Sequence, residues 1–279
     1  MVAEAWQAVA SSTPAAGQAE GRGESTSEVE RAQAEWMRQQ RIFLLGAGAV
    51  GSRNALLLAE HDMTLIVVDH DAVEEHNTIG DRTLYQLGDV GQLKVYALRD
   101  KLAILCPNAV VDAHPRNVHD FTDGELRLMA QQCAAALVAV DEGAALLRLN
   151  HLLYSQLMML YQGVHRLGQS GQVIITRPGS PCLKCCLDVQ DANEIQTLHH
   201  EPGLGIHTGA VAQLAVQVLV QELAARGGSP LGQHLGENVS VLFTSHMASE
   251  LTPSGPGIVC FAATGDPECE VCGNLNERR

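Results

Sequence analysis

Ile42-Phe43-Leu44-Leu45 runs directly into Gly46-Ala47-Gly48-Ala49-Val50-Gly51, and this stretch indicates the class of fold. The four apolar residues predict a strand that is buried on both faces. The glycines follow the G-x-G-x-x-G spacing: the first permits a tight turn, the second lets a phosphate approach the backbone, and the third lets a helix pack closely. Residues 52–60 predict that helix, so Gly46, Gly48 and Gly51 predict a nucleotide site at its N-terminus.

The strand predicted at Thr64–Val68 ends at Asp69, where a carboxylate can hydrogen-bond ribose hydroxyls. The glycine spacing does not separate NAD from ATP, and a turn used only for packing is the alternative reading.

Later segments continue the alternation of strands and helices. Apolar strands between helices predict an α/β fold, a Rossmann-like and mostly parallel sheet with helices on both faces. After mid-chain the pattern changes, and we expect antiparallel strands to extend that sheet. The expected elements are a helix at 94–105, strands at 110–111 and 136–140, a strand at 172–176, a helix at 210–225, and strands at 240–243 and 257–260.

The domain organisation follows from composition. Residues 1–27 are rich in Ala, Ser, Gly and Glu without periodicity, so we expect a flexible N-terminal tail. Residues 28–279 show neither a linker nor an internal repeat and predict a single domain that opens with a short helix at 28–40.

The charge of the chain disfavours several classes of partner. The 279 residues include 18 basic and 32 acidic side chains, a formal net charge of −14. Such a chain has no long-range attraction for nucleic acid or an anionic membrane. We find no signal peptide and expect no uncharged segment of the roughly 18 residues that span a bilayer. A cytoplasmic protein is therefore expected, with its eight cysteines used for metal and core.

Two cysteine pairs predict a metal site. Cys182-Leu183-Lys184-Cys185 and Cys269-Glu270-Val271-Cys272 each allow two thiolates to reach one ion. Four thiolates complete the tetrahedral shell of a structural Zn²⁺, which would tie the C-terminal segment back onto the domain. Four unrelated buried cysteines are the alternative, and the neighbouring Cys186 is expected to be a packed side chain and not a fifth ligand.

The polar residues after Asp69 add a family resemblance. Asp69 and Asp71 are followed by Asn77 and Arg82, then by Asp89-Val90-Gly91-Gln92-Leu93-Lys94, and later by Asp141 after a strand. With the two cysteine pairs, these motifs resemble the ThiF/MoeB/HesA family, bacterial relatives of ubiquitin-activating enzymes, over residues 42–273.

The resemblance implies a role for each residue. Asp69 and Asp71 would belong to the nucleotide site, with Asp69 on the ribose, and Asn77, Arg82 and Lys94 would contact phosphates. Asp141 would bind Mg²⁺ near the α-phosphate, so Arg82, Lys94 and Asp141 would serve catalysis. The alternatives are that Arg82 and Lys94 are solvated charges, that Asp71 is a turn residue, and that Asp141 only caps a helix at 143–150.

The sequence also departs from the family pattern. Asn77 and Arg82 are five residues apart instead of three, because of Gly80-Asp81, which leaves the equivalence of Arg82 open. We expect residues 187–208 to form a loop, on which relatives carry a thioester or persulfide cysteine. This segment contains no cysteine, and Cys186 and Cys260 are the alternatives for that role. That loop carries His199, His200 and His207 instead, which are expected to face solvent. Upstream of the glycines, Arg31, Arg38 and Arg41 are candidates for reaching a partner's ATP, and none of them is assigned that role.

The resemblance implies a homodimeric adenylyltransferase that uses ATP, Mg²⁺ and a structural Zn²⁺. Its substrate would be the Gly-Gly tail of a small ubiquitin-like or sulfur-carrier protein, and the adenylate would pass to a sulfur donor or an acceptor enzyme. Another peptide, or a tRNA-linked substrate, is a nearby possibility. An NAD-dependent oxidoreductase and a catalytically silent nucleotide-binding scaffold are the alternatives from other classes.

Overall fold

One mixed sheet of eight strands organises the chain. A computed structural model describes residues 26–165, 169–189, 191–199, 205–228, 241–245 and 255–273. The strand order is β3-β2-β1-β4-β5-β6-β7-β8. Neighbours from β3 to β5 are parallel, and those from β5 to β8 are antiparallel. The strands are β1 (Arg41–Leu45), β2 (Thr64–Val68), β3 (Val110–His114), β4 (Ala135–Val138), β5 (Met158–His165), β6 (Ser170–Thr176), β7 (Val241–Ser245) and β8 (Gly257–Phe261).

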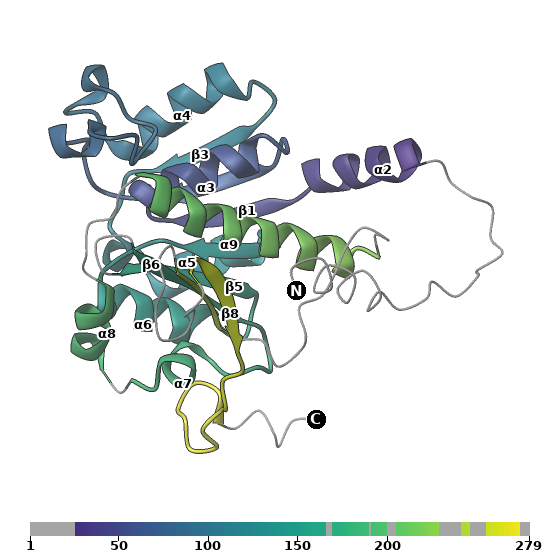
Figure 1. The fold of residues 1–279 in the computed structure, drawn as a ribbon, viewed down its shortest axis with the longest axis vertical. Coiled ribbons are helices and arrows are strands. Elements are labelled where there is room, and N and C mark those ends of the chain that lie inside the picture. Colours follow the sequence, from purple (N-terminus) through teal and green to yellow (C-terminus); the bar gives the residue numbers. More distant parts are fainter. Residues whose placement is uncertain are drawn as a thin grey trace.

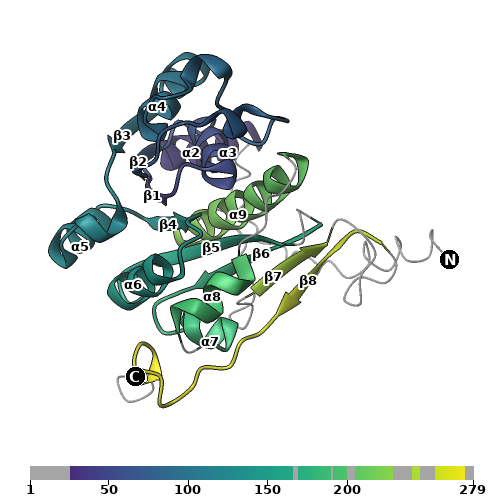
Figure 2. The same ribbon diagram turned by 90° about the vertical axis from the view of Figure 1, so that its left-hand side faces the viewer.

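Helices cover both faces of this sheet, as the sequence predicted (Figures 1 and 2). One face packs against α3 (Ala49–Ala59), α4 (Lys94–Leu105), α9 (Gly205–Arg226) and the end of α2 (Thr26–Arg38). The other packs against α5 (Asp123–Gln131), α6 (Gly143–Leu153), α7 (Leu183–Leu187) and α8 (Ala192–His199). Side chains of β1 point alternately to the two faces of the sheet. Ile42 and Leu44 pack in the core on the α3 side, Phe43 and Leu45 pack in the core on the α6 side, and all four are fully buried.

Several boundaries differ from the sequence prediction. Helix α3 begins at Ala49, three residues before the expected Ser52, because Gly48 takes the extended N-cap conformation and Gly51 lies inside the helix. Strand β3 runs to His114, not Val111. Strand β5 and helix α5 were missed. Short 3-10 helices connect other elements, η1 (Glu75–Thr78), η2 (Leu87–Asp89) and η3 (Val118–Asp120).

The N-terminal helix α2 begins at Thr26, two residues before the predicted start. Its last turn is anchored, because Met37 is buried in the core and Trp36 packs against that core from its edge. The predicted flexible tail lies almost wholly outside the described residues, so the tail and the one-domain division stay predictions.

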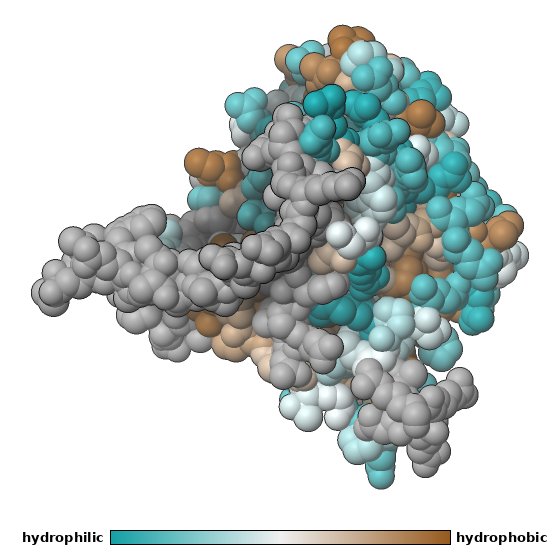
Figure 3. Space-filling view, turned by 90° about the vertical axis from the view of Figure 1, so that its right-hand side faces the viewer, coloured by the Kyte–Doolittle hydropathy of each residue, from teal (hydrophilic) through white to brown (hydrophobic). Residues whose placement is uncertain are grey.

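Among the described helices, α9 alone is long and apolar enough to cross a membrane by length and composition. Residues 202–221 carry no Asp, Glu, Lys or Arg, so the expectation that no uncharged stretch reaches 18 residues was wrong. In the fold, 56% of the apolar window is buried, where α9 packs against α3, β5 and β6. Outside the grey atoms, the face in Figure 3 is largely hydrophilic, with hydrophobic residues in small separate groups.

Candidate functional site

A pocket of ≈ 580 Å³ lies where the parallel strands end. Its walls come from the segments that follow β1, β2, β3 and β4, together with part of β5. Ligands of open α/β sheets bind at this edge, beyond the carboxyl ends of the strands. The structure brings eight of the nine predicted nucleotide-site and magnesium residues to the pocket wall, all but Gly51: Gly46, Gly48, Asp69, Asp71, Asn77, Arg82, Lys94 and Asp141.

The three glycines are required for different reasons. Gly46 has φ +96°, and a Cβ there would lie 2.6 Å from the carbonyl oxygen of Ala139. A Cβ on Gly51 would collide with the carbonyl oxygen of Gly46. A Cβ on Gly48 would meet no atom within 4 Å, and Gly48 lines the pocket. Packing therefore explains Gly46 and Gly51, whereas Gly48 leaves room for a group outside the protein, which suits an approaching phosphate.

This difference predicts opposite results for two alanine variants. Gly48→Ala has room and an ordinary φ of −74°, so Tm should stay unchanged while the affinity for ATP falls at least about tenfold, since the methyl group occupies the phosphate's space. Gly51→Ala should lower the stability by about 1–3 kcal/mol through overpacking. Thermal unfolding and calorimetric titration with ATP measure both, and unchanged ATP affinity in Gly48→Ala would contradict the phosphate role.

Asp69 fixes the glycine loop to the end of β2. Its Oδ2 accepts a hydrogen bond from the Ala47 N–H at 2.7 Å, and its Oδ1 accepts one from the Asp71 N–H at 2.8 Å. Burial raises the pKa of Asp69, and the positive charge of Lys94 opposes that rise. Each carboxylate oxygen keeps a second lone pair, so Asp69 can hold the loop and still accept a hydroxyl donor.

Lys94 and Asp71 form an ion pair inside the pocket. The Nζ of Lys94 lies 2.7 Å from the Oδ2 of Asp71, and the Lys94 N–H donates to the Asp71 carbonyl oxygen at 2.8 Å. Lys94 is 9% exposed, so the reading of Lys94 as a solvated surface charge was wrong. Burial would raise the pKa of Asp71, but the hydrogen bond and charge of Lys94 outweigh it and lower that pKa.

Arg82 stands at the pocket wall as a cation that no described residue engages by a hydrogen bond or ion pair. It is partly buried. The insert before it turns away from the pocket: Gly80 and Asp81 both have positive φ, and the Nη2 of Arg53 in α3 donates to the Asp81 carbonyl oxygen. The two extra residues are thus absorbed in a turn against α3, and Arg82 still reaches the pocket.

Asn77 and Asp141 complete the polar wall. The Oδ1 of Asn77 accepts from the Glu74 N–H at 2.9 Å, which caps η1. Asp141 is exposed and follows β4. The N-cap of α6 is Glu142, one residue after Asp141, and the magnesium role of Asp141 stays a prediction.

Sequence reasoning missed two parts of the wall. Arg116, Asn117 and Val118 follow β3, whose predicted range stopped too early to show where it ended. The guanidinium carbon of Arg116 lies 3.9 Å from the centre of the Phe121 ring. Gln162 comes from the missed strand β5. Only residues 116–118 could have been predicted from the sequence, because a polar run that follows a strand is visible there.

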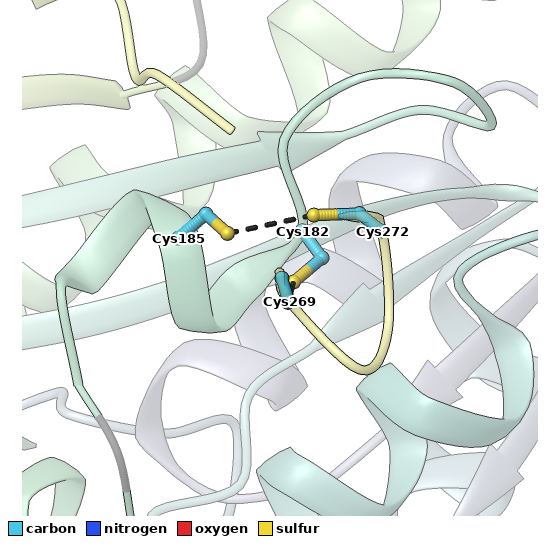
Figure 4. Close-up of side chains that lie close together, drawn as sticks. All are labelled: Cys182, Cys185, Cys269 and Cys272. Atoms are coloured by element: carbon cyan, nitrogen blue, oxygen red, sulfur yellow. Dashed lines mark hydrogen bonds between the residues drawn. The ribbon is translucent and has the colours of Figure 1, made fainter. Parts of the chain in front are cut away.

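The two predicted cysteine pairs, each called a knuckle below, lie close together in the structure (Figure 4). Their sulfurs all lie within 4.8 Å of one another. The Sγ of Cys182 is 3.7 Å from that of Cys269, and the Sγ of Cys185 is 3.4 Å from that of Cys272. Zn–S bonds of about 2.3 Å in a tetrahedron place sulfurs about 3.8 Å apart, so the donors suit Zn²⁺.

The surroundings of the cysteines support a closed structural site. Cys182 and Cys272 are buried beside Tyr154. The Nζ of Lys184 donates to the Oε1 of Glu270 at 2.9 Å, which links the two knuckles a second time. Burial raises the pKa of the Cys182 thiol to about 11, and a bound divalent cation would reverse this, because a coordinated thiol is deprotonated. Cys186 lies outside the group of four, as expected.

Residues 187–208 are not one loop, contrary to expectation. Helix α8 spans Ala192–His199, so His199 ends a helix. His207 lies in the first turn of α9 and is partly buried, so it is not a solvent-facing loop residue. His200 lies outside the described residues.

Comparison with known proteins gives relatives by sequence. The sequence profile of the ThiF family matches residues 23–248. Ubiquitin-like modifier-activating enzyme 5 of Caenorhabditis briggsae is 28% identical over 180 residues, which cover 60% of this chain and 41% of that protein. The Caenorhabditis elegans protein of the same name is 27% identical over 169 residues, covering 54% of this chain and 38% of that protein. The chain thus spans well under half the length of these relatives.

Solved structures share the fold. The structure of E. coli MccB with ATP has a TM-score of 0.68 and 17% identity, covering 86% of this chain and 69% of MccB. The complex of E. coli MccB with MccA-N7isoASN has a TM-score of 0.69 and 17% identity, covering 87% and 69%. PaaA has a TM-score of 0.63 and 16% identity, covering 94% and 82%.

Proposed function

Because this chain belongs to the ThiF family, we propose that it is an ATP-dependent adenylyltransferase that activates a carboxylate as an acyl-adenylate. The observation that carries the proposal is the pocket at the strand ends, where Gly48 leaves room for a phosphate beside Arg82 and Lys94. An NAD-dependent oxidoreductase has no use for these cations and an acid such as Asp141 around the same glycine loop.

The chain's residues suit each part of this reaction. A carboxylate oxygen of the substrate attacks the α-phosphorus, the bond from that phosphorus to the bridging oxygen breaks, and pyrophosphate leaves with the electron pair. No general base is required, because the carboxylate is already ionised at neutral pH. Arg82 and Lys94 would stabilise the negative charge that develops on the phosphate oxygens. Asp141 would hold Mg²⁺, which supplies further positive charge to those oxygens.

The proposed substrate is the C-terminal Gly-Gly tail of a small ubiquitin-like or sulfur-carrier protein. The curated relatives named for activating ubiquitin-like modifiers support it. MccB has been solved with MccA, which supports a different peptide as the second candidate, and a tRNA-linked substrate is a third. Residues 187–208 contain no cysteine, so we propose that the adenylate passes to an outside nucleophile, a sulfur donor or an acceptor enzyme.

The test is ATP–[³²P]pyrophosphate exchange on the purified protein, with small Gly-Gly-tailed proteins and free peptides as separate additions. Exchange that depends on one of these additions is the expected result and identifies the substrate. ATP binding without exchange under every addition would favour the silent scaffold. A change in nicotinamide absorbance with a substrate would favour the oxidoreductase.

We further propose that the protein is a cytoplasmic homodimer. Arg38 and Arg41 are engaged within their own chain, by Asp62 at 2.9 Å and by Gln132 at 2.8 Å, and neither lines the pocket. If a second copy supplied Arg38 or Arg41, the contact of that arginine within its own chain would therefore have to be released. Light scattering after size exclusion measures the mass, and a monomer at working concentration would contradict the dimer.

A further inference from the structure

Asn54 and Gln162 form a buried pair of amides between α3 and β5. Asn54 is fully buried and Gln162 is 7% exposed. The Nδ2 of Asn54 donates to the Oε1 of Gln162 at 3.1 Å. Within the described part of the chain, the Oδ1 of Asn54 and the Nε2 of Gln162 have no hydrogen-bond partner.

An unsatisfied amide at this place calls for a partner from outside. Buried polar groups are nearly always hydrogen-bonded, and leaving one unmade costs free energy that an apolar side chain would avoid. Gln162 lines the pocket and Asn54 does not. At the pocket wall, Gln162 therefore carries a buried Nε2 donor that no described residue satisfies.

The sheet order places Gln162 far from the ribose end of the pocket. Asp69 follows β2, and β5 lies three strands further along, in the order β2-β1-β4-β5. Neighbouring strands are about 4.8 Å apart, so these two ends are separated by about 14 Å. A ribose at Asp69 with phosphates at the glycine loop leaves the β5 end for whatever is joined to the α-phosphate. Gly163 and Val164 of β5 line the same end.

We propose that Gln162 binds the acyl substrate, with its Nε2 donating to an oxygen of the substrate's C-terminal residue. Asn54 is a positioning residue, because its Nδ2 holds the Oε1 of Gln162 and so fixes the orientation of the Gln162 amide. This inference rests on the proposed function. The β5 end of the pocket would then bind the acyl group through an amide N–H donor. Such a donor suits a carboxylate or peptide carbonyl oxygen as acceptor.

The test compares two ligands that differ by the acyl group, AMP and glycyl-sulfamoyl-adenosine, by calorimetric titration. Gln162→Met removes the donor, and Gln162→Glu keeps an acceptor for Asn54 while it replaces the NH₂ group with oxygen. In both variants the analogue should bind about 10- to 100-fold more weakly, the range for one lost buried hydrogen bond, while AMP binding changes less than about twofold. Gln172→Met, on β6 and away from the pocket wall, is the matched control and should change neither.

The outcomes separate this inference from the proposed function. Analogue binding that is unchanged in both variants, or AMP and analogue weakened equally, would overturn the role of Gln162 while ATP chemistry stands. If wild type binds neither AMP nor the analogue, the proposed function fails and this inference with it. Thermal unfolding identifies a variant that does not fold. The near-isosteric Gln162→Glu then carries the test, because it preserves the contact to Asn54.

Discussion

Arg82→Ala is expected to lower the rate of ATP–pyrophosphate exchange by about 10²- to 10³-fold, the range for losing one donor to developing transition-state charge. Its Tm should stay within about 1 °C of wild type, because Arg82 is only partly buried and no described residue engages its side chain by a hydrogen bond or ion pair. Exchange assays and thermal unfolding on the same preparations measure both. This combination separates a loss of chemistry from a loss of fold.

The control is Arg127→Ala, an exposed arginine in α5 that does not line the pocket, and it should retain full exchange. Lys94→Ala and Asp141→Ala should abolish exchange as well. Lys94→Ala should also lower the stability slightly, because it removes the ion pair at 2.7 Å with Asp71, whose half-exposed carboxylate stays solvated. Exchange at the wild-type rate in Arg82→Ala would show that the five-residue spacing from Asn77 has removed this arginine from the reaction.

Cys182→Ser combined with Cys269→Ser is expected to remove zinc and stability together. The two substitutions leave one ligand on each knuckle, and the free energy of structural zinc binding is folding free energy. A loss of about 5 kcal/mol would lower Tm by about 10–20 °C in a domain of this size. Elemental analysis should give one zinc per wild-type chain and none in the double variant.

Cys186→Ser is the matched control for the zinc site. Cys186 is adjacent to Cys185, but its sulfur lies outside the group of four, so the variant should keep its zinc and lose little stability. Zinc lost from Cys186→Ser would make it a ligand and reopen the assignment of the four. Wild-type protein purified without any zinc would sink the metal proposal.

The parts of the fold that sequence predicted well are those with strong local signals. Strand Thr64–Val68 and helix Lys94–Leu105 were predicted to the residue. Strand β5 was missed because Met158–His165 mixes apolar residues with Gln162, Gly163 and His165, which breaks both periodicities. Its burial comes from pairing with β4 and β6, and no local pattern carries that information.

The sequence by itself determined where the two candidate sites lie, because glycine spacing and paired cysteines constrain the backbone locally. It predicted a nucleotide site at the glycine loop Gly46–Gly51 and a metal site at Cys182, Cys185, Cys269 and Cys272. Only the tertiary structure decided which groups are engaged and which are available. In the tertiary structure Lys94 pairs with Asp71, and Arg82 lies at the pocket wall without a described partner. The Nε2 of Gln162 is buried without a hydrogen-bond partner among the described residues. Those outcomes depend on residues far apart in sequence that meet only when the sheet forms.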